Sequence, residues 1–203
     1  MDFYLRDDVV LIAKELLGKI IVTKFDGIVT AGRIVETEAY AGISDKASHA
    51  YNNRRTNRTE VMFSKTGVAY VYLCYGIHHF FNVVCNTNEH PDAVLIRGIE
   101  PLEGIDTMLQ RSNKKKPDAS LGRGPGNVSK ALGIFTNHNG IDLQSKELYV
   151  ANDGATGFEI AVSKRIGVDY AGDHANWLYR FFVHGNQHVS KHVFNKEGIL
   201  LLK

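Results

Sequence analysis

The sequence predicts an α+β fold: one mixed domain, covering residues 1–203, around a curved and mostly antiparallel sheet. Three observations lead to this prediction. Short apolar segments rich in Val, Ile, Tyr and Phe follow one another along the chain, turn dipeptides separate several of them, and helical periodicity is confined to a few places. The chain has no internal repeat, low-complexity tract or evident linker, and its 203 residues suit a single domain.

An amphipathic helix is expected near the start of the chain, over residues 8–17. Apolar side chains recur there at helical spacing, Asp7 is in position to cap the N-terminus, and Gly18 stands where a helix-ending glycine belongs. Two strands follow, KIIVTKF and IVTAGRIVETEAY. The dipeptide between them, Asp26-Gly27, favours a tight hairpin turn, so these two strands are expected to pair.

A second hairpin is predicted further along, in GVAYVYLCYGIHHFFNVVC. Its strands are rich in Val, Tyr and Phe, and Tyr75-Gly76 lies at the break, which places Tyr75 near the tip. A polar loop, about residues 41–66, precedes this hairpin, and an apolar strand, DAVLIRGIE, follows it.

Short helices and strands complete the prediction. Pro101 is expected to open a short helix, because proline suits the first helical position. The segment GRGPGNVSKALGI predicts a glycine-broken start to another helix. Two further short strands are expected, at residues 160–162 and 180–183.

Composition narrows the class of protein. Hydrophobic residues make up 44% of the chain and charged residues 23%, which is ordinary for a soluble globular protein. The N-terminus lacks the pattern of a signal or transit peptide, and no segment predicts a membrane span, so the cytosol, with its nucleic acid, is the expected location. Cys74 and Cys85 do not form a CxxC pair, and two reduced, partly buried thiols are expected.

The net charge of +2 is too small to indicate a nucleic-acid partner by itself. The charge is unevenly spread, however: NNRRTNR, at residues 52–58, contains no acid, and residues 111–130 contain six basic residues against one acid. Each run alone is typical of a solvated loop, but two such runs in one small domain favour contacts with phosphates. The predicted DNA-backbone contacts are Arg54, Arg55, Arg58 and Lys130.

The stretch RIVETEAYAG, residues 33–42, carries acids where an apolar strand is expected. Alternation along a strand places Ile34, Glu36, Glu38 and Tyr40 on one face. A carboxylate beside an aromatic ring can activate water while the ring stacks on a planar substrate. The alternative is an edge strand whose solvent face happens to hold two glutamates.

An aromatic side chain at the tip of a hairpin is harder to explain by packing, because burying it needs a partner surface. A wedge on a hairpin tip is one way in which proteins separate stacked base pairs, and Tyr75 is placed to be such a wedge. Basic loops, a wedge, an aromatic pocket and an acid are together what an enzyme needs to act on a base in a duplex.

The sequence resembles the alkyladenine (3-methyladenine, or methylpurine) DNA glycosylase family. The resemblance rests on IVETEAYAG and DKASHA, on RTNR followed by MFSKTGVAYVYLCYGIHHFFNVV, and on LIRGIEPLEG, and is nearly continuous over residues 33–104. It continues in GRGPGNVSKALGI, RIGVDYAG and RFFVHG. It implies a curved antiparallel sheet with a protruding, DNA-intercalating β-hairpin. The implied partner is double-stranded DNA that contains damaged purines, for which a monomer suffices and no cofactor or metal is expected.

The resemblance assigns a role to individual residues, position by position. Glu38 falls on the glutamate that activates water, and Arg97 falls on an arginine near that glutamate and the target phosphate. Tyr75 matches the tyrosine that fills the gap left in the DNA helix. The implied pocket residues are Tyr40, His49 and Tyr72, which sandwich the flipped base, and Asn82, which obstructs the exocyclic amine of guanine.

The expected reaction is hydrolysis of the bond between a purine and deoxyribose, through a transition state that resembles an oxocarbenium ion. Glu38 accepts a proton from water and, as an anion, stabilises the cationic sugar. The expected bases are 3-methyladenine and 7-methylguanine, with hypoxanthine and ethenoadenine as further candidates. Because the matched pocket holds no lysine that could form a Schiff base, a monofunctional enzyme without lyase activity is expected.

Several alternatives stay open at this point. Glu36 could be a second catalytic acid or a partner that orients Arg97. Residues 122–126 could cradle a phosphate at the start of the next helix or form a flexible connection. The chain also differs from vertebrate members of the family at His78 and His79, just after the wedge, and in its longer turn NTNEHPD.

Two rival functions come from other classes of protein. One is a metal-dependent hydrolase, in which Glu36 and Glu38 bind a cation together with histidines. His184, His188 and His192 recur at a spacing that aligns ligands on a helix. The other is a non-catalytic nucleic-acid-binding protein that uses the tyrosine-rich hairpin as a stacking platform.

Overall fold

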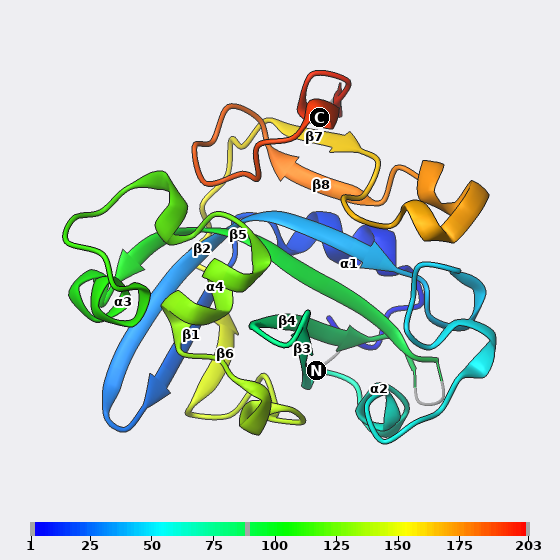
Figure 1. Cartoon of the computed structure of the whole chain (residues 1–203), viewed down its shortest axis with the longest axis horizontal. Helices are drawn as coiled ribbons and strands as arrows, with labels where there is room; N and C mark the ends of the chain where they lie inside the picture. The colour runs from blue at the N-terminus through cyan, green and yellow to red at the C-terminus, as the bar shows by residue number, and fades with distance from the viewer. Residues whose placement is uncertain (1–2, 88–89, 202–203) are drawn as a thin grey trace.

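An antiparallel sheet organises this computed structural model, which describes residues 3–87 and 90–201 (Figure 1). Within the described residues the sheet has nine strands, in the order β3-β4-β5-β2-β8-β7-β9, with β1 paired to β2 and β6 paired to β1. The α+β class and the mostly antiparallel sheet are therefore confirmed. The strands are β1 (Ile20–Phe25), β2 (Ile28–Tyr40), β3 (Ala69–Cys74), β4 (His78–Cys85), β5 (Asp92–Glu103), β6 (Leu148–Ala151), β7 (Ile160–Ser163), β8 (Arg180–Val183) and β9 (Ile199–Leu200).

Four α-helices accompany the sheet in the described part of the chain: α1 (Val9–Leu16), α2 (Glu60–Ser64), α3 (Ile105–Ser112) and α4 (Pro125–Leu132). Figure 1 shows α1 beside the long strands β2 and β5, and α4 near the β3–β4 hairpin. The main core joins buried side chains of α1, α3 and α4 to those of the central strands. None of these helices is long and apolar enough to cross a membrane.

The first helix and hairpin form nearly as predicted. α1 begins after Asp8, whose carboxylate accepts a hydrogen bond from the Leu11 N–H at 2.9 Å, so Asp8 and not Asp7 is the N-cap. Asp8 is one residue closer to the first turn and can reach its unpaired N–H groups. β1 and β2 pair up to the two-residue turn Asp26-Gly27, in which both residues have positive φ, as the sequence predicts.

The prediction for Pro101 is wrong. β5 continues through this proline to Glu103, and α3 begins only at Ile105. Pro101 lies opposite Gly32, next to a shift in the register between β2 and β5. A strand tolerates proline at such an irregularity because a ladder hydrogen bond is already missing there.

The alternation predicted for RIVETEAYAG is also interrupted. The register of β2 against β5 shifts on both sides of Glu36. As a result Ile34 packs in the main core together with Ala39, while Val35 packs in a separate cluster with Phe182. Ile34 therefore does not belong to the group of side chains that contains the two acids.

The other predicted elements have mixed outcomes. The short strands near residues 160 and 180 and the helix after GRG are present, whereas β6 and β9 are not foreseen from the sequence. The polar loop at residues 41–66 contains α2 and two short 3₁₀ turns. Both cysteines are free thiols, with Cys85 buried and Cys74 partly buried, as expected. Part of the NTNEHPD turn, residues 88–89, lies outside the described residues.

Candidate active site

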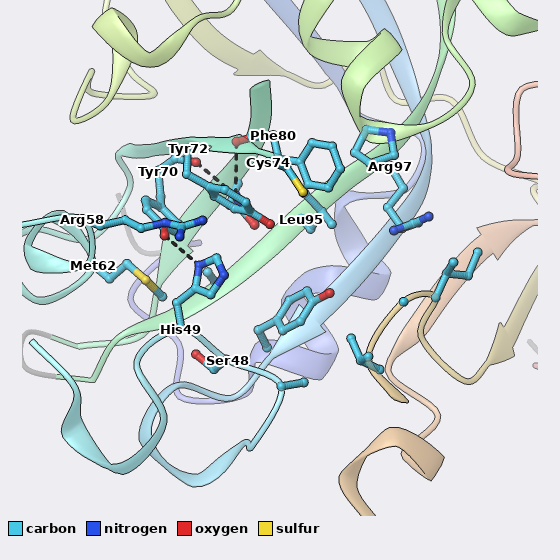
Figure 2. A pocket seen from close by; sticks show the side chains of 18 of the residues that line it. Ser48, His49, Arg58, Met62, Tyr70, Tyr72, Cys74, Phe80, Leu95 and Arg97 are labelled. Atoms are coloured by element: carbon cyan, nitrogen blue, oxygen red, sulfur yellow. Dashed lines mark hydrogen bonds between the residues drawn. The ribbon is translucent and has the colours of Figure 1, made fainter. Parts of the chain in front are cut away.

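A cavity of about 460 Å³ lies between the β3–β4 hairpin, the ends of β2 and β5, the segment 47–49 and the segment 166–170 (Figure 2). This volume falls in the range of small-molecule sites. The four pocket residues that the family resemblance implied, Tyr40, His49, Tyr72 and Asn82, line the cavity together with Arg97. They come from β2, a loop, β3, β4 and β5, so the fold assembles the site from distant parts of the sequence.

Aromatic rings form one wall of the cavity. The ring of Tyr72 lies 4.7 Å from that of His49, 5.3 Å from that of Tyr70 and 5.6 Å from that of Phe80, measured between centroids. His49 Nδ1 shares a hydrogen bond of 2.8 Å with the Tyr70 hydroxyl, visible as a dashed line in Figure 2. Tyr70 is buried, as expected of a core residue, but it also lines the cavity, as does Phe80.

The imidazole of His49 is neutral in this environment. Burial lowers the pKa of His49 to about 4, and the positive charges of Arg58 and Arg54 act in the same direction. An uncharged ring at neutral pH is suited to stacking, and it does not repel a cationic base.

Glu38 lies directly behind the cavity wall and is fully buried. Its Oε2 accepts hydrogen bonds from the Tyr40 hydroxyl at 2.8 Å and from Arg97 at 3.3 Å, and its Oε1 accepts one from the Ile166 N–H at 2.8 Å. All three donors belong to residues that line the cavity. Burial, followed by the nearby Glu38 carboxylate, raises the pKa of Tyr40 well above its ordinary value, so this hydroxyl keeps its proton.

Glu36 faces a different set of partners. Its Oε1 contacts Arg180 Nε at 2.7 Å and Arg97 Nε at 3.2 Å, and its Oε2 accepts the Ser190 N–H at 2.7 Å. Burial alone raises the pKa of Glu36, but the charges of Arg97 and Arg180 and these hydrogen bonds outweigh it, and the pKa falls below its usual value. Glu36 therefore contacts two arginines and a backbone N–H, and it is not among the residues that line the cavity.

A second buried ion pair supports Tyr40 from behind. Arg165 pairs with Asp45 through both terminal guanidinium nitrogens, and its guanidinium carbon lies 4.8 Å from the centre of the Tyr40 ring. Arg165 also donates to the Ala39 carbonyl at 2.9 Å. Our sequence reasoning missed Arg165, Asp45 and Ile166, although they lie in RIGVDYAG and DKASHA, two motifs that carry the family resemblance.

The β3–β4 hairpin carries an exposed apolar tip beside the cavity. The strands pair up to Cys74 and His78, so residues 75–77 form the turn. Tyr75 is 91% exposed and Ile77 is 71% exposed, while Tyr75 also contributes to the cavity rim. Nothing in the described structure buries these side chains, which leaves them available to a partner surface.

The two histidines that follow the tip rest on other elements. A Cβ atom at Gly126, in the first turn of α4, would lie only 3.0 Å from the His78 ring, so glycine permits a close approach between helix and hairpin. The His79 ring lies 5.1 Å from the ring of Phe135. At Gly122, a Cβ atom would clash at 2.0 Å with the Ile99 carbonyl oxygen, so this part of segment 122–126 is packed on β5 and is not a loose connection.

The basic residues predicted to bind DNA lie in two places. Arg54, Arg55 and Lys130 are exposed, and Arg55 forms an ion pair of 2.7 Å with Glu60. Arg58 instead lines the cavity. Its guanidinium carbon lies 4.6 Å from the centre of the Tyr72 ring.

The histidine spacing that suggested a metal site does not form a helix. His192 precedes a 3₁₀ turn, His188 lies beside the Ala119 carbonyl at 3.0 Å, and His184 lies near Glu159 at 3.8 Å. Within residues 3–87 and 90–201, no group of three or more His, Cys, Asp or Glu side chains is arranged to hold a metal ion.

An enzyme that cuts the bond between a base and its sugar first has to take the base out of the stack and hold it. Such an enzyme requires an aromatic-walled cavity next to an exposed hairpin tip, and this chain has both. These features put the protein in the class of DNA glycosylases.

The chain belongs to the methylpurine-DNA glycosylase (MPG) family, whose model matches residues 2–187. A relative from Clostridium perfringens (strain 13 / Type A) is 45% identical over 200 residues, which are 94% of this chain and 97% of the relative. One from Clostridium acetobutylicum is 45% identical over 196 residues, 93% and 95% of the two chains. One from Chlamydia felis (strain Fe/C-56) is 46% identical over 182 residues, 89% and 93%. Each of these is named "Putative 3-methyladenine DNA glycosylase". The predicted family is confirmed.

Proposed function

We propose that this protein is a monofunctional base-excision glycosylase that flips alkylated or deaminated purines out of double-stranded DNA and hydrolyses their N-glycosidic bond. One observation supports this proposal above the others: Glu38, directly behind the wall of an aromatic cavity, pairs with Arg97, which lines that cavity. Burying a carboxylate costs free energy, and a purely binding protein gives this one no chemical task.

In the proposed mechanism the flipped base lies among Tyr40, His49 and Tyr72. A base that already carries a positive charge gains a cation–π attraction there of roughly 0.5–2 kcal/mol. Arg97 lies near the target phosphate and pairs with the buried Glu38 carboxylate, while Glu36 orients Arg97. Asn82, whose side-chain amide donates to the Tyr70 carbonyl at 3.1 Å, obstructs the exocyclic amine of guanine.

The burial of Glu38 requires one rearrangement. In the free protein the Tyr40 hydroxyl occupies Glu38 Oε2. We infer that the entering nucleotide moves the Tyr40 side chain, so that a water molecule takes the place of its hydroxyl. That water adds to C1′ as the bond to the base breaks, and its proton passes to Glu38.

Monofunctional chemistry is a prediction with a direct test. A lyase needs an amine that forms a Schiff base with C1′, and no lysine is among the described residues that line the cavity. We expect that borohydride, added during turnover on lesion DNA, traps no covalent protein–DNA adduct. A trapped adduct, located by peptide mass spectrometry to a lysine of this chain, contradicts the proposal.

Affinity for DNA is expected to depend on salt. Arg54 and Lys130 each contribute about one phosphate contact, so Arg54→Ala lowers the slope of log affinity against log salt by about 1, for every DNA sequence alike. Lys130→Ala on α4 has the same expected effect. Titrations of a fluorescent duplex between low and physiological salt measure the slope, and an unchanged slope in both variants argues against these contacts.

The activity itself is tested with a panel of oligonucleotide duplexes, each containing one modified purine. Release of 3-methyladenine, 7-methylguanine, hypoxanthine or ethenoadenine is scored, and an end-point assay for abasic sites separates an enzyme from a binding protein. We place the reaction in the cytoplasm, where a prokaryotic chromosome lies, with the protein acting as a monomer. Absence of abasic sites on every member of the panel contradicts the proposed function.

A further inference from the structure

Arg58 lies at the cavity, although its position in NNRRTNR predicts a contact with the DNA backbone. It lines the cavity, and its guanidinium carbon lies 4.6 Å from the centre of the Tyr72 ring. Figure 2 shows it beside Tyr70 and His49. Its charge is felt by these neighbours: burial raises the pKa of Tyr70 to about 12 and Arg58 opposes the rise, and Arg58 adds to the burial that lowers the pKa of His49.

The two ends of the cavity differ in charge. Arg97, at one end, is balanced by the carboxylates of Glu36 and Glu38. Arg58 lies at the other end in Figure 2, and no ion pair joins it to a carboxylate among the described residues. In the binding mode proposed above, a base held on the Tyr72 ring has the Arg58 cation on its own side and the carboxylate of Glu38 on the side of the sugar.

We propose that Arg58 promotes departure of the base by stabilising the electrons that the base receives. This inference rests on the glycosylase function proposed above. When the bond between C1′ and N9 breaks, its electron pair goes to N9, water adds to C1′, and the proton of that water goes to Glu38. A cationic base becomes neutral, and a neutral base becomes anionic until it takes up a proton. In both cases the charge on the base falls by one unit, and a cation at the base end stabilises this change.

Binding and chemistry then respond to Arg58 in different ways. Before the bond breaks, a cationic base is repelled by Arg58, whereas a neutral base is not. The repulsion disappears as the electron pair of the breaking bond moves onto the base. For cationic lesions, Arg58 therefore destabilises the bound ground state relative to the transition state. In the free protein Arg58 is exposed to water, which screens its charge, and a duplex that covers the cavity removes much of that water.

The test compares Arg58→Met with Arg58→Lys, two side chains of similar length that differ in charge. Single-turnover rates are measured on duplexes with 7-methylguanine or hypoxanthine. We expect Arg58→Met to lower both rates about tenfold and Arg58→Lys to stay within about threefold of the original protein. Lys146→Met, an exposed cation away from the cavity, controls for the loss of one charge and is expected to leave both rates unchanged.

Affinity gives a second readout that does not depend on turnover. Binding is measured in a Glu38→Gln background, as the ratio of affinities for 7-methylguanine and hypoxanthine duplexes. Arg58→Met is expected to raise this ratio about threefold to tenfold, because the ratio cancels any general loss of phosphate binding. Unchanged single-turnover rates in Arg58→Met, or an unchanged affinity ratio, overturn the inference while leaving the glycosylase function intact. A protein that releases no base from any duplex of the four-lesion panel overturns both.

Discussion

Glu38→Gln is expected to lower the single-turnover rate of base release by roughly 10³-fold, while affinity for lesion-containing duplex stays within about threefold. An amide cannot accept the proton of the attacking water, and it does not stabilise a cationic sugar as an anion does. The glutamine carbonyl can still accept the Ile166 N–H, and Glu36 still balances Arg97. Base release by chromatography and binding by fluorescence anisotropy measure the two quantities separately.

Glu36→Gln is the matched control, because both acids are buried in β2 and both contact Arg97. This substitution removes the carboxylate that Arg180 and Arg97 share, so we expect the free energy of unfolding of the Glu36→Gln variant to fall by about 3 kcal/mol. Thermal unfolding of both variants separates stability from chemistry. If Glu38→Gln releases 3-methyladenine at the original rate, Glu38 is not the residue that activates water.

Tyr75→Ala is expected to lower excision from duplex DNA by about 100-fold, because unstacking a base costs a few kcal/mol and the wedge offsets that cost. Excision from single-stranded DNA with the same lesion is expected to be nearly unchanged. Tyr75 is 91% exposed, so its replacement removes no packing from the core. Single-turnover rates on both substrates give the comparison.

Tyr75→Phe is the control that keeps the ring and removes only the hydroxyl. Since stacking depends on the ring, this variant is expected to act on duplex DNA within about threefold of the original protein. Equal losses on duplex and single-stranded substrates in Tyr75→Ala show that Tyr75 acts in the pocket and not as a wedge.

Local signals in the sequence were sufficient to predict both hairpins. Asp26-Gly27 and Tyr75-Gly76 are turn dipeptides, and positive φ at all four residues satisfies the geometry that such turns require. Each signal lies within the element that it predicts. The exposed position of Tyr75 follows from the same reasoning, because a side chain at the tip of a hairpin has no neighbouring strand to cover it.

The burial of Glu38 could not be predicted in this way. Alternation along β2 indicates which side chains share a face, but not what covers that face. Here the covering residue is Ile166, which lies 128 residues further along the chain and donates its N–H to the carboxylate. The register shift at Glu36 is equally absent from local patterning, because it is seen only in the pairing of β2 with β5, and Glu36 also pairs with Phe182 of β8.

The position of Arg58 also could not be predicted from local sequence patterns. A run such as NNRRTNR predicts a basic surface, but it does not indicate which arginine folds back. The 3₁₀ turn at Tyr51–Asn53 and the helix α2 fix the path of this loop, and only the resulting geometry places Arg58 over the Tyr72 ring. Placement on an aromatic ring depends on tertiary structure, which charge patterning does not contain.

The central claim is that a buried carboxylate meets water only when a damaged base fills the cavity. A crystal structure of Glu38→Gln bound to duplex DNA with one lesion tests this claim most directly. We expect the base among Tyr40, His49 and Tyr72, the Tyr40 hydroxyl moved away from the side chain at position 38, and an ordered water between that side chain and C1′. A base seated in the cavity with the Tyr40 hydroxyl still bonded to that side chain, and no water beside it, contradicts the account.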